Sequence, residues 1–257
     1  VLSACSINIG ADRSSGRYER DAAGYGANDG VVERSLSVQS FTKFECRLPV
    51  AVTYVQTNDQ APKVVLKGAP AMVERCVVDV RDGKLLLRLA QNTEQNRKRF
   101  SKSRDKLKIT VYGGQLTSLE MMTACTFYAA QLEATQLSLA NSGASIINVG
   151  RLVAQQLTLS CSGASSTRLG GSVGKLTMSI TGAANLGAQD LVEQELKAEM
   201  KGSTLGKLAV QGSAKVDVSG ASSLTLSGTA DLFTINCVGA SRSEERRVGK
   251  ECASMCR

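Results

Sequence analysis

A glycine recurs at intervals of about twenty residues through the second half of this chain, and this repeat constrains the fold more strongly than any other feature. The repeated positions are Gly143, Gly163, Gly182, Gly202, Gly220 and Gly239. Such a period is typical of solenoid proteins, in which each repeat forms one turn and stacks on the next. We therefore expect an elongated repeat structure.

The residues that precede each glycine alternate between apolar and polar side chains. Before Gly163, for example, residues 157–162 have the sequence LTLSCS. Strict alternation over such a length predicts a strand with one buried face. Stacked in parallel, strands of this kind pair with their equivalents about 4.8 Å above and below, and their inward side chains form one continuous core. The sequence therefore predicts an all-β fold, a right-handed parallel β-helix (a β-solenoid) with turns of about 20 residues.

The repeated glycines are predicted to be structural, at one corner of each turn. A corner needs either a positive φ or a backbone approach that leaves no room for a Cβ, and glycine meets both needs.

The repeat register decides the secondary structure expected for the segment 190–202, DLVEQELKAEMKG. Its helix-forming residues and terminal glycine by themselves predict a helix. Because LVEQEL at Leu191 repeats LVAQQL at Leu152 two turns earlier, we predict a strand there.

Two further regions precede the β-helix repeats, which span residues 113–241. Residues 35–112 form an N-terminal β region with more alternating segments and a hairpin signal at Asp82-Gly83. We expect its strands to begin or cap the solenoid. Residues 6–34 are polar and glycine-rich without a period, which predicts a flexible linker.

The two ends of the chain have separate interpretations. Leu2-Ser3-Ala4-Cys5 resembles a bacterial lipobox, so residues 1–5 are interpreted as the remainder of a lipoprotein signal and Cys5 as the lipidated residue. Acyl chains on Cys5 would anchor the protein to a membrane surface without spanning it. Residues 242–257 break the hydroxyl-rich composition abruptly and resemble a translated sequencing adapter, so we interpret them as a non-native tail outside the fold.

The chain from about residue 35 to 241 resembles a family of bacterial cell-envelope proteins, the putative autotransporter-adhesin head GIN domain. The resemblance rests on FECRLPVAVTY from Phe44, DGKLLLRL from Asp82, KLKITV from Lys106 with LTSLE from Leu116, and the repeated Ser-Gly-Ala-Ser. It implies a β-helix, an adhesive role and a place in the cell envelope as an outer-membrane lipoprotein, periplasmic or surface-exposed. It implies no catalytic residues.

Composition removes several kinds of site. The chain has no histidine, which excludes Ser-His-Asp and Cys-His nucleophiles and histidine-ligated metals. The cysteines show no metal-binding spacing, so we expect no cofactor and no metal; whether Cys46, Cys76 or Cys125 form a disulfide stays open. The segment 170–175, GGSVGK, departs from a phosphate-binding loop in its glycine spacing and has no hydroxyl residue directly after the lysine.

Two groups of charged residues are candidates for ligand contact. The first lies in the loop QNTEQNRKRFSKSRDK and consists of Arg97, Lys98, Arg99, Lys102, Arg104 and Lys106. These side chains suit phosphate-rich glycolipid or acidic polysaccharide, and the alternative is a solvated hairpin tip. In the second group, Glu199 and Asp217 fall in one outward column, flanked by Lys197, Lys201 and Lys215. This group suits contact with a glycan, and the alternative is a charge ladder neutralised by the lysines.

The function that we predict is a non-enzymatic, lipid-anchored envelope protein whose Ser/Thr-rich β-helix surface binds a glycan, a surface protein or another copy of itself. The alternative is a carbohydrate-active β-helix enzyme that uses Glu199 and Asp217, because paired carboxylates at about 5 Å suit retaining glycoside hydrolysis. We expect no nucleic-acid partner, since an exported lipoprotein rarely meets one and the basic loop has a single aromatic residue, Phe100.

Overall fold

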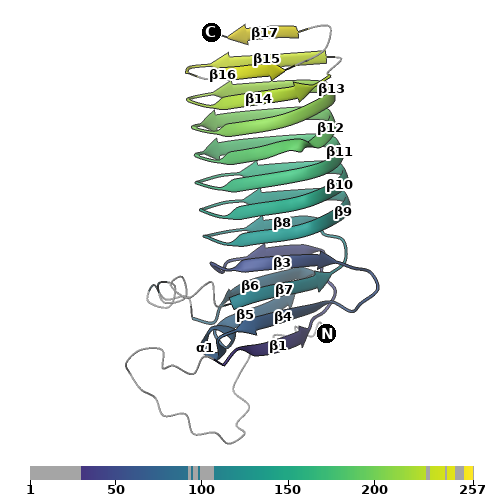
Figure 1. The fold of residues 1–257 in the computed structure, drawn as a ribbon, viewed down its shortest axis with the longest axis vertical. Helices are drawn as coiled ribbons and strands as arrows, with labels where there is room; N and C mark the ends of the chain where they lie inside the picture. The colour runs from purple at the N-terminus through teal and green to yellow at the C-terminus, as the bar shows by residue number, and fades with distance from the viewer. Residues whose placement is uncertain are drawn as a thin grey trace, which may run out of the picture.

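The computed structural model describes residues 30–91, 94, 98, 107–229, 232–240, 242–246 and 252–256. Seventeen strands in this part of the chain form one coiled sheet (Figure 1). In chain order the strands are β1 (Val32–Ser37), β2 (Lys43–Cys46), β3 (Ala51–Gln56), β4 (Lys63–Gly68), β5 (Cys76–Arg81), β6 (Lys84–Leu89), β7 (Leu107–Gly113), β8 (Ser118–Met121), β9 (Thr126–Asn141), β10 (Ile146–Cys161), β11 (Ser166–Gly182), β12 (Asn185–Gly202), β13 (Leu205–Ser219), β14 (Ser223–Gly228), β15 (Leu232–Val238), β16 (Arg242–Arg246) and β17 (Cys252–Cys256).

The strands from β9 onward form the predicted solenoid, with about 6 turns in all and rungs of about 20 residues. Neighbouring turns pair in parallel, so that Leu157 lies beside Leu137 on one side and Leu176 on the other. The strand prediction for residues 190–202 is confirmed, because β12 runs from Asn185 to Gly202. Repeat register therefore outweighs the helix propensity of this segment.

Each turn has three sides, which the alternation alone did not predict. Along β10, buried and outward residues alternate except at Gly150-Arg151 and Gln155-Gln156, where two consecutive residues face outward. At such a pair the chain bends and the next residue points inward again. The repeated glycine provides the third corner. The inward side chains of all three sides then meet in one apolar core that continues from turn to turn.

The corner glycines need both properties that the sequence indicated. Their φ angles all lie between +72° and +99°, in the left-handed region that disfavours residues with a Cβ. A Cβ on Gly163 would also lie only 2.7 Å from the carbonyl oxygen of Gly143, and one on Gly182 only 2.9 Å from that of Gly163. The amide of Ala164 donates a 2.8 Å hydrogen bond to the Gly143 oxygen, which holds successive corners together.

The N-terminal β region continues directly into the solenoid, as predicted. Strands β2 and β3 pair in parallel with β8 and β9, and below them β1, β4 and β7 pair antiparallel (Figure 1). The rings of Phe44, Tyr54 and Phe127 pack across this junction with centroids 6.0 to 6.4 Å apart. Strands β5 and β6 form the predicted hairpin, with positive φ at both Asp82 and Gly83.

Helix α1 (Pro70–Val73) is a single turn. Within the described residues, no helix has the length and apolar composition needed to cross a bilayer.

Two predicted boundaries need correction. The linker prediction, residues 6–34, is too long at its end, because Val32 already begins β1 and pairs with Gly68 of β4. Polar composition did not reveal this strand, since its pairing is supplied by a distant segment. At the other end, β16 and β17 pair in parallel with β14 and β15, so the ladder continues into residues 242–257. Backbone groups at an open sheet edge accept further strands of almost any sequence, so the origin of this tail stays a prediction.

Candidate binding surface

The outward residues of one side form two columns over successive turns, because the turns pair in register. One column runs Ser138, Thr158, Thr177, Lys197, Lys215 and Thr234, and its neighbour runs Ala140, Ser160, Ser179, Glu199, Asp217 and Asn236. Hydroxyl groups therefore predominate on the earlier turns, charges appear on the turns of Glu199 and Asp217, and the last turn of each column is uncharged again. The register brings together all four residues of the second predicted group, Lys197, Glu199, Lys215 and Asp217.

Glu199 and Asp217 are neighbours in this register, but each carboxylate already has a partner. Glu199 Oε1 forms a 2.5 Å ion pair with Lys201 Nζ, and Asp217 Oδ1 accepts a 2.7 Å hydrogen bond from Asn236 Nδ2. The hydrogen bond to Glu199 raises the pKa of Lys201. Both carboxylates lie exposed on the outward face of the sheet, where water screens their charges. Because each carboxylate is already engaged by a neighbouring side chain on an open face, this arrangement gives the enzyme alternative no support.

Most of the first predicted group lies outside the described residues. Arg97, Arg99, Lys102, Arg104 and Lys106 belong to that undescribed part, and so does the predicted lipidation site, Cys5. Lys98 is described: it is exposed and its Nζ lies 2.8 Å from Oε1 of Glu94, four residues earlier in the sequence. The role of the basic loop therefore stays a prediction.

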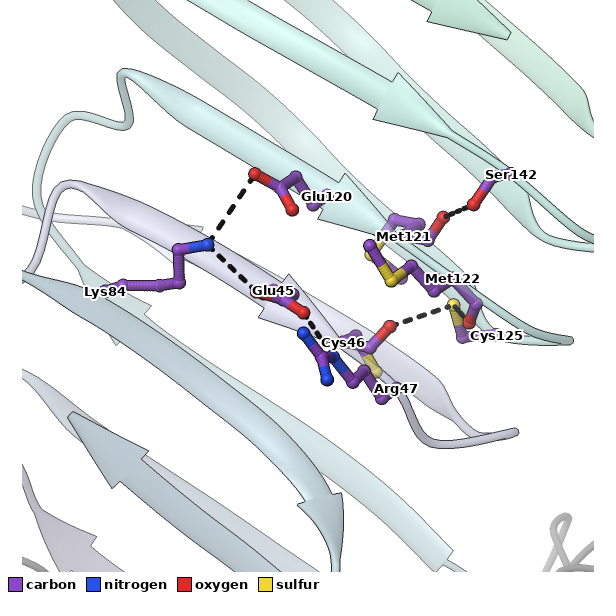
Figure 2. A network of polar contacts seen from close by, with 9 residues as sticks. All are labelled: Glu45, Cys46, Arg47, Lys84, Glu120, Met121, Met122, Cys125 and Ser142. Atoms are coloured by element: carbon purple, nitrogen blue, oxygen red, sulfur yellow. Dashed lines mark hydrogen bonds and ion pairs between the residues drawn. The ribbon is translucent and has the colours of Figure 1, made fainter. Parts of the chain in front are cut away.

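A polar cluster around one buried carboxylate, which sequence reasoning missed, lies where the N-terminal region meets the solenoid (Figure 2). Glu45 of β2 is only 3% exposed, accepts a 2.9 Å hydrogen bond from Lys84 Nζ of β6, and is ion-paired with Arg47. Lys84 Nζ also lies 3.7 Å from Glu120 Oε1 of β8. The cluster thus clamps three neighbouring strands, and charge in the alternating β2 sequence was the only available signal for it.

Hydrogen bonding decides the charge state of this cluster. Burial opposes ionisation of Glu45, but hydrogen bonds from Lys84 and Arg47 hold its pKa below the ordinary value. The bond to Glu45 in turn raises the pKa of Lys84. Both groups are therefore charged near neutral pH and paired with each other, which suits a structural clamp rather than proton transfer.

The cysteines beside this cluster are free thiols (Figure 2). Cys125 Sγ donates a 3.0 Å hydrogen bond to the carbonyl oxygen of Met122 and lies 3.8 Å from the carbonyl oxygen of Cys46. The neighbouring Cys125 thiol, together with burial, raises the pKa of Cys46 well above its ordinary value, and burial raises that of Cys76 to about 12. Neutral, buried thiols are poor nucleophiles, so this group has the properties of core residues.

A second buried carboxyl, Glu193, was also missed. It stands in an inward column in which Ala154, Val173 and Val210 occupy the same position on neighbouring turns. Glu193 is 0% exposed, and neither carboxyl oxygen has a hydrogen-bond partner among the described residues. Burial raises its pKa to about 8. The signal was present in the repeat, since aligning LVEQEL with LVAQQL places Glu193 at the inward position of Ala154.

The described residues contain no group of three or more cysteine, aspartate or glutamate side chains arranged to hold a metal ion. What remains as a candidate site is the outward surface of the solenoid. Besides the columns above, it includes a hollow around Gly187 on a neighbouring side, which is lined by Arg168 and Lys207. No sequence motif indicated this hollow, because its residues meet only when the turns are stacked.

Comparison with solved structures identifies the same architecture in three bacterial proteins. A putative adhesin from Bacteroides fragilis superposes with a TM-score of 0.75 at 17% identity, over 86% of this chain and 97% of that one. A putative lipid binding protein from Parabacteroides distasonis has a TM-score of 0.58 at 13% identity, over 86% of this chain and 98% of that one. A putative adhesin from Parabacteroides merdae has a TM-score of 0.52 at 15% identity, over 89% of this chain and 96% of that one. At these identities the likeness shows the fold alone.

No curated protein matches this sequence. The sequence of residues 40–244 does match the family model described as putative auto-transporter adhesin, head GIN domain. This match covers most of the chain and includes the N-terminal β region together with the solenoid. The chain therefore belongs to the family of putative auto-transporter adhesins with a head GIN domain.

Proposed function

We propose that this protein is a non-enzymatic binding module of the bacterial cell envelope, which presents the outward surface of its solenoid to a glycan or protein partner. The observation that carries the proposal is the parallel register of the turns, which repeats polar side chains about every 4.8 Å along each outward column. A partner with its own repeat, such as an extended polysaccharide, can then make the same contact on several turns. Membership in a family of putative adhesins supports this role.

Attachment through a lipid on Cys5, which precedes β1 in the sequence, would suit such a role. Strand β1 lies at one end of the stack and β17 at the other (Figure 1). About 6 turns at 4.8 Å give the solenoid a length of about 29 Å. A chain held to the outer membrane through acyl groups on Cys5 would therefore carry its later turns away from the lipid surface, where a partner can reach them.

Binding by the full chain to an array of bacterial envelope glycans and to whole bacterial cells tests this proposal. We expect saturable binding to at least one glycan or surface protein, with no turnover of the bound polysaccharide. The Glu199→Gln variant is the control for chemistry, because it removes a carboxylate of the enzyme alternative and leaves the fold unchanged. Absence of any binding to cells and glycans, or polysaccharide cleavage that Glu199→Gln abolishes, would overturn the proposal.

Anchoring needs a separate experiment in a bacterial host. The complete precursor should fractionate with membranes and incorporate a labelled fatty acid, and a Cys5→Ala variant should do neither. Labelling that persists in Cys5→Ala would show that Cys5 is not the lipidated residue.

A further inference from the structure

The hollow around Gly187 is formed by a missing side chain between two cations. Arg168, Gly187 and Lys207 are register partners on three successive turns and follow one outward column. At about 4.8 Å per turn, the backbones of the two cationic residues stand about 10 Å apart. The hollow has a volume of about 280 Å³, close to the lower limit of about 300 Å³ for small-molecule sites.

The cations of this hollow are available to a ligand. Arg168 and Lys207 are both exposed, and neither forms an ion pair with any residue that the structure describes. By contrast, Lys175 and Lys201 on the same turns are paired with Glu195 and Glu199. An anion between Arg168 and Lys207 would therefore gain charge-assisted hydrogen bonds without displacing an existing partner.

The remaining walls suit a sugar better than a bare anion. Thr225 continues the column of cations, and Gln189 borders Gly187, so hydroxyl and amide groups surround the space. Leu205 lies in the adjacent column and is 54% exposed, which gives the hollow one apolar edge. Polar groups that fix orientation beside an apolar surface are the usual composition of a small-ligand site.

We propose that this hollow binds an acidic saccharide unit, with its carboxylate or sulfate held between Arg168 and Lys207 and its ring against Leu205. The inference rests on the proposed binding function and deepens it by naming a ligand class and a place. It differs from the basic loop and from the Glu199 column, which lie on other parts of the chain.

Gly187 offers a variant that fills the hollow and keeps both charges. Its φ is outside the left-handed region, and an added Cβ would lie 3.6 Å from Gln189 Oε1 and 4.0 Å from Arg168 Nε, which are ordinary contacts. Gly187→Val therefore introduces a β-branched side chain that a strand accepts well. Loss of binding in this variant reports on the space itself and not on net charge.

The experiment is a titration of the full chain with a trigalacturonate, in which binding is measured by calorimetry or by NMR chemical shifts. Arg168→Gln and Lys207→Gln should each weaken binding about tenfold, because each removes a hydrogen bond to a charged group. Gly187→Val should abolish binding, and added salt should weaken it. Lys108→Gln, an exposed charge change on β7, is the matched control and should leave the affinity unchanged.

Parallel titrations decide the ligand class. A sulfated trisaccharide that binds with the same dependence on Arg168 and Lys207 supports the proposal, because carboxylate and sulfate supply the same charge. Equal affinity for a neutral galactose trimer, or for inorganic sulfate alone, overturns it. Acidic-saccharide binding unaffected by Gly187→Val and Arg168→Gln also overturns it while leaving the proposed function intact. No binding of any acidic saccharide overturns it as well, and binding to cells then decides the proposed function separately.

Discussion

Replacing Glu193 by valine should stabilise the protein, and the gain should grow as the pH rises. The substitution places in this position the residue type that occupies the same inward column one turn away on each side, at Val173 and Val210. The carboxyl is fully buried and has no hydrogen-bond partner in the part of the chain that the structure describes, so its ionised form is disfavoured in the folded state.

The size of the effect follows from the two pKa values of Glu193. Its folded-state pKa is about 8, against an ordinary value of 4.5 for an unfolded chain. Because the folded pKa is the higher one, the unfavourable contribution is absent below pH 4.5, increases between pH 4.5 and 8, and is complete above pH 8. The difference amounts to about 3 kcal/mol at pH 7 and about 1 kcal/mol at pH 5.

Urea unfolding at pH 5, 7 and 8.5, followed by far-ultraviolet circular dichroism, measures this difference, since the chain has no tryptophan for fluorescence. Glu193→Val should unfold at higher urea than the wild type, with a gap that widens at each step in pH. Glu193→Gln removes the charge but keeps the length of the side chain, so it should show the same pH trend. Glu195→Gln, an exposed carboxylate paired with Lys175, should change stability by less than about 1 kcal/mol. A gap that stays constant or narrows with pH would refute the reasoning.

Three further predictions follow from the described contacts. Gly163→Ala should lower the free energy of unfolding by about 1–2 kcal/mol or more, because φ is +72°, whereas Gly187→Ala should not; equal effects would contradict the corner argument. Lys84→Met should lower the free energy of unfolding by about 1–3 kcal/mol, because it removes a partner of buried Glu45. The pKa of Glu45 is lowered in the folded state, so this stabilisation should be present above the ordinary pKa of the carboxyl and lost as the pH falls through its folded-state pKa. An unchanged urea midpoint at pH 7 would refute the clamp. Cys46 should resist alkylation in the native protein and react in urea, as peptide mass mapping can show, and rapid native labelling would contradict its burial.

Much of the fold could be predicted because the information is local and repeated. The alternation in 157–162 specifies a strand with one buried face, and the same pattern returns in each turn, so register could overrule the helix propensity of 190–202. The positive φ of Gly163 and the hairpin at Asp82-Gly83 are likewise properties of a few neighbouring residues. Family motifs, spread from Phe44 to the repeated Ser-Gly-Ala-Ser, then indicated the family that the comparison confirmed.

The candidate sites were less predictable, because they depend on which residues face each other across turns. Glu199 and Asp217 were correctly expected in one column with lysines beside them, but only the structure shows that Lys201 pairs with Glu199 and that Asn236 pairs with Asp217. Side-chain partners in a solenoid are set by exact register, and a shift of one residue would turn each side chain to the opposite face. Periodicity predicts the column and cannot predict its hydrogen bonds.

The sequence by itself determined that the chain is a stacked β-solenoid with glycine corners, because period and alternation act within single turns. Tertiary structure alone decided the three-sided cross-section, the clamp of Glu45 with Lys84 and the hollow at Gly187. The clamp and the hollow join residues about twenty or more positions apart through stacking or strand pairing, and the bends that give three sides are fixed by packing inside the stacked turns. Their energies come from burial and from contacts between turns, which no local pattern contains.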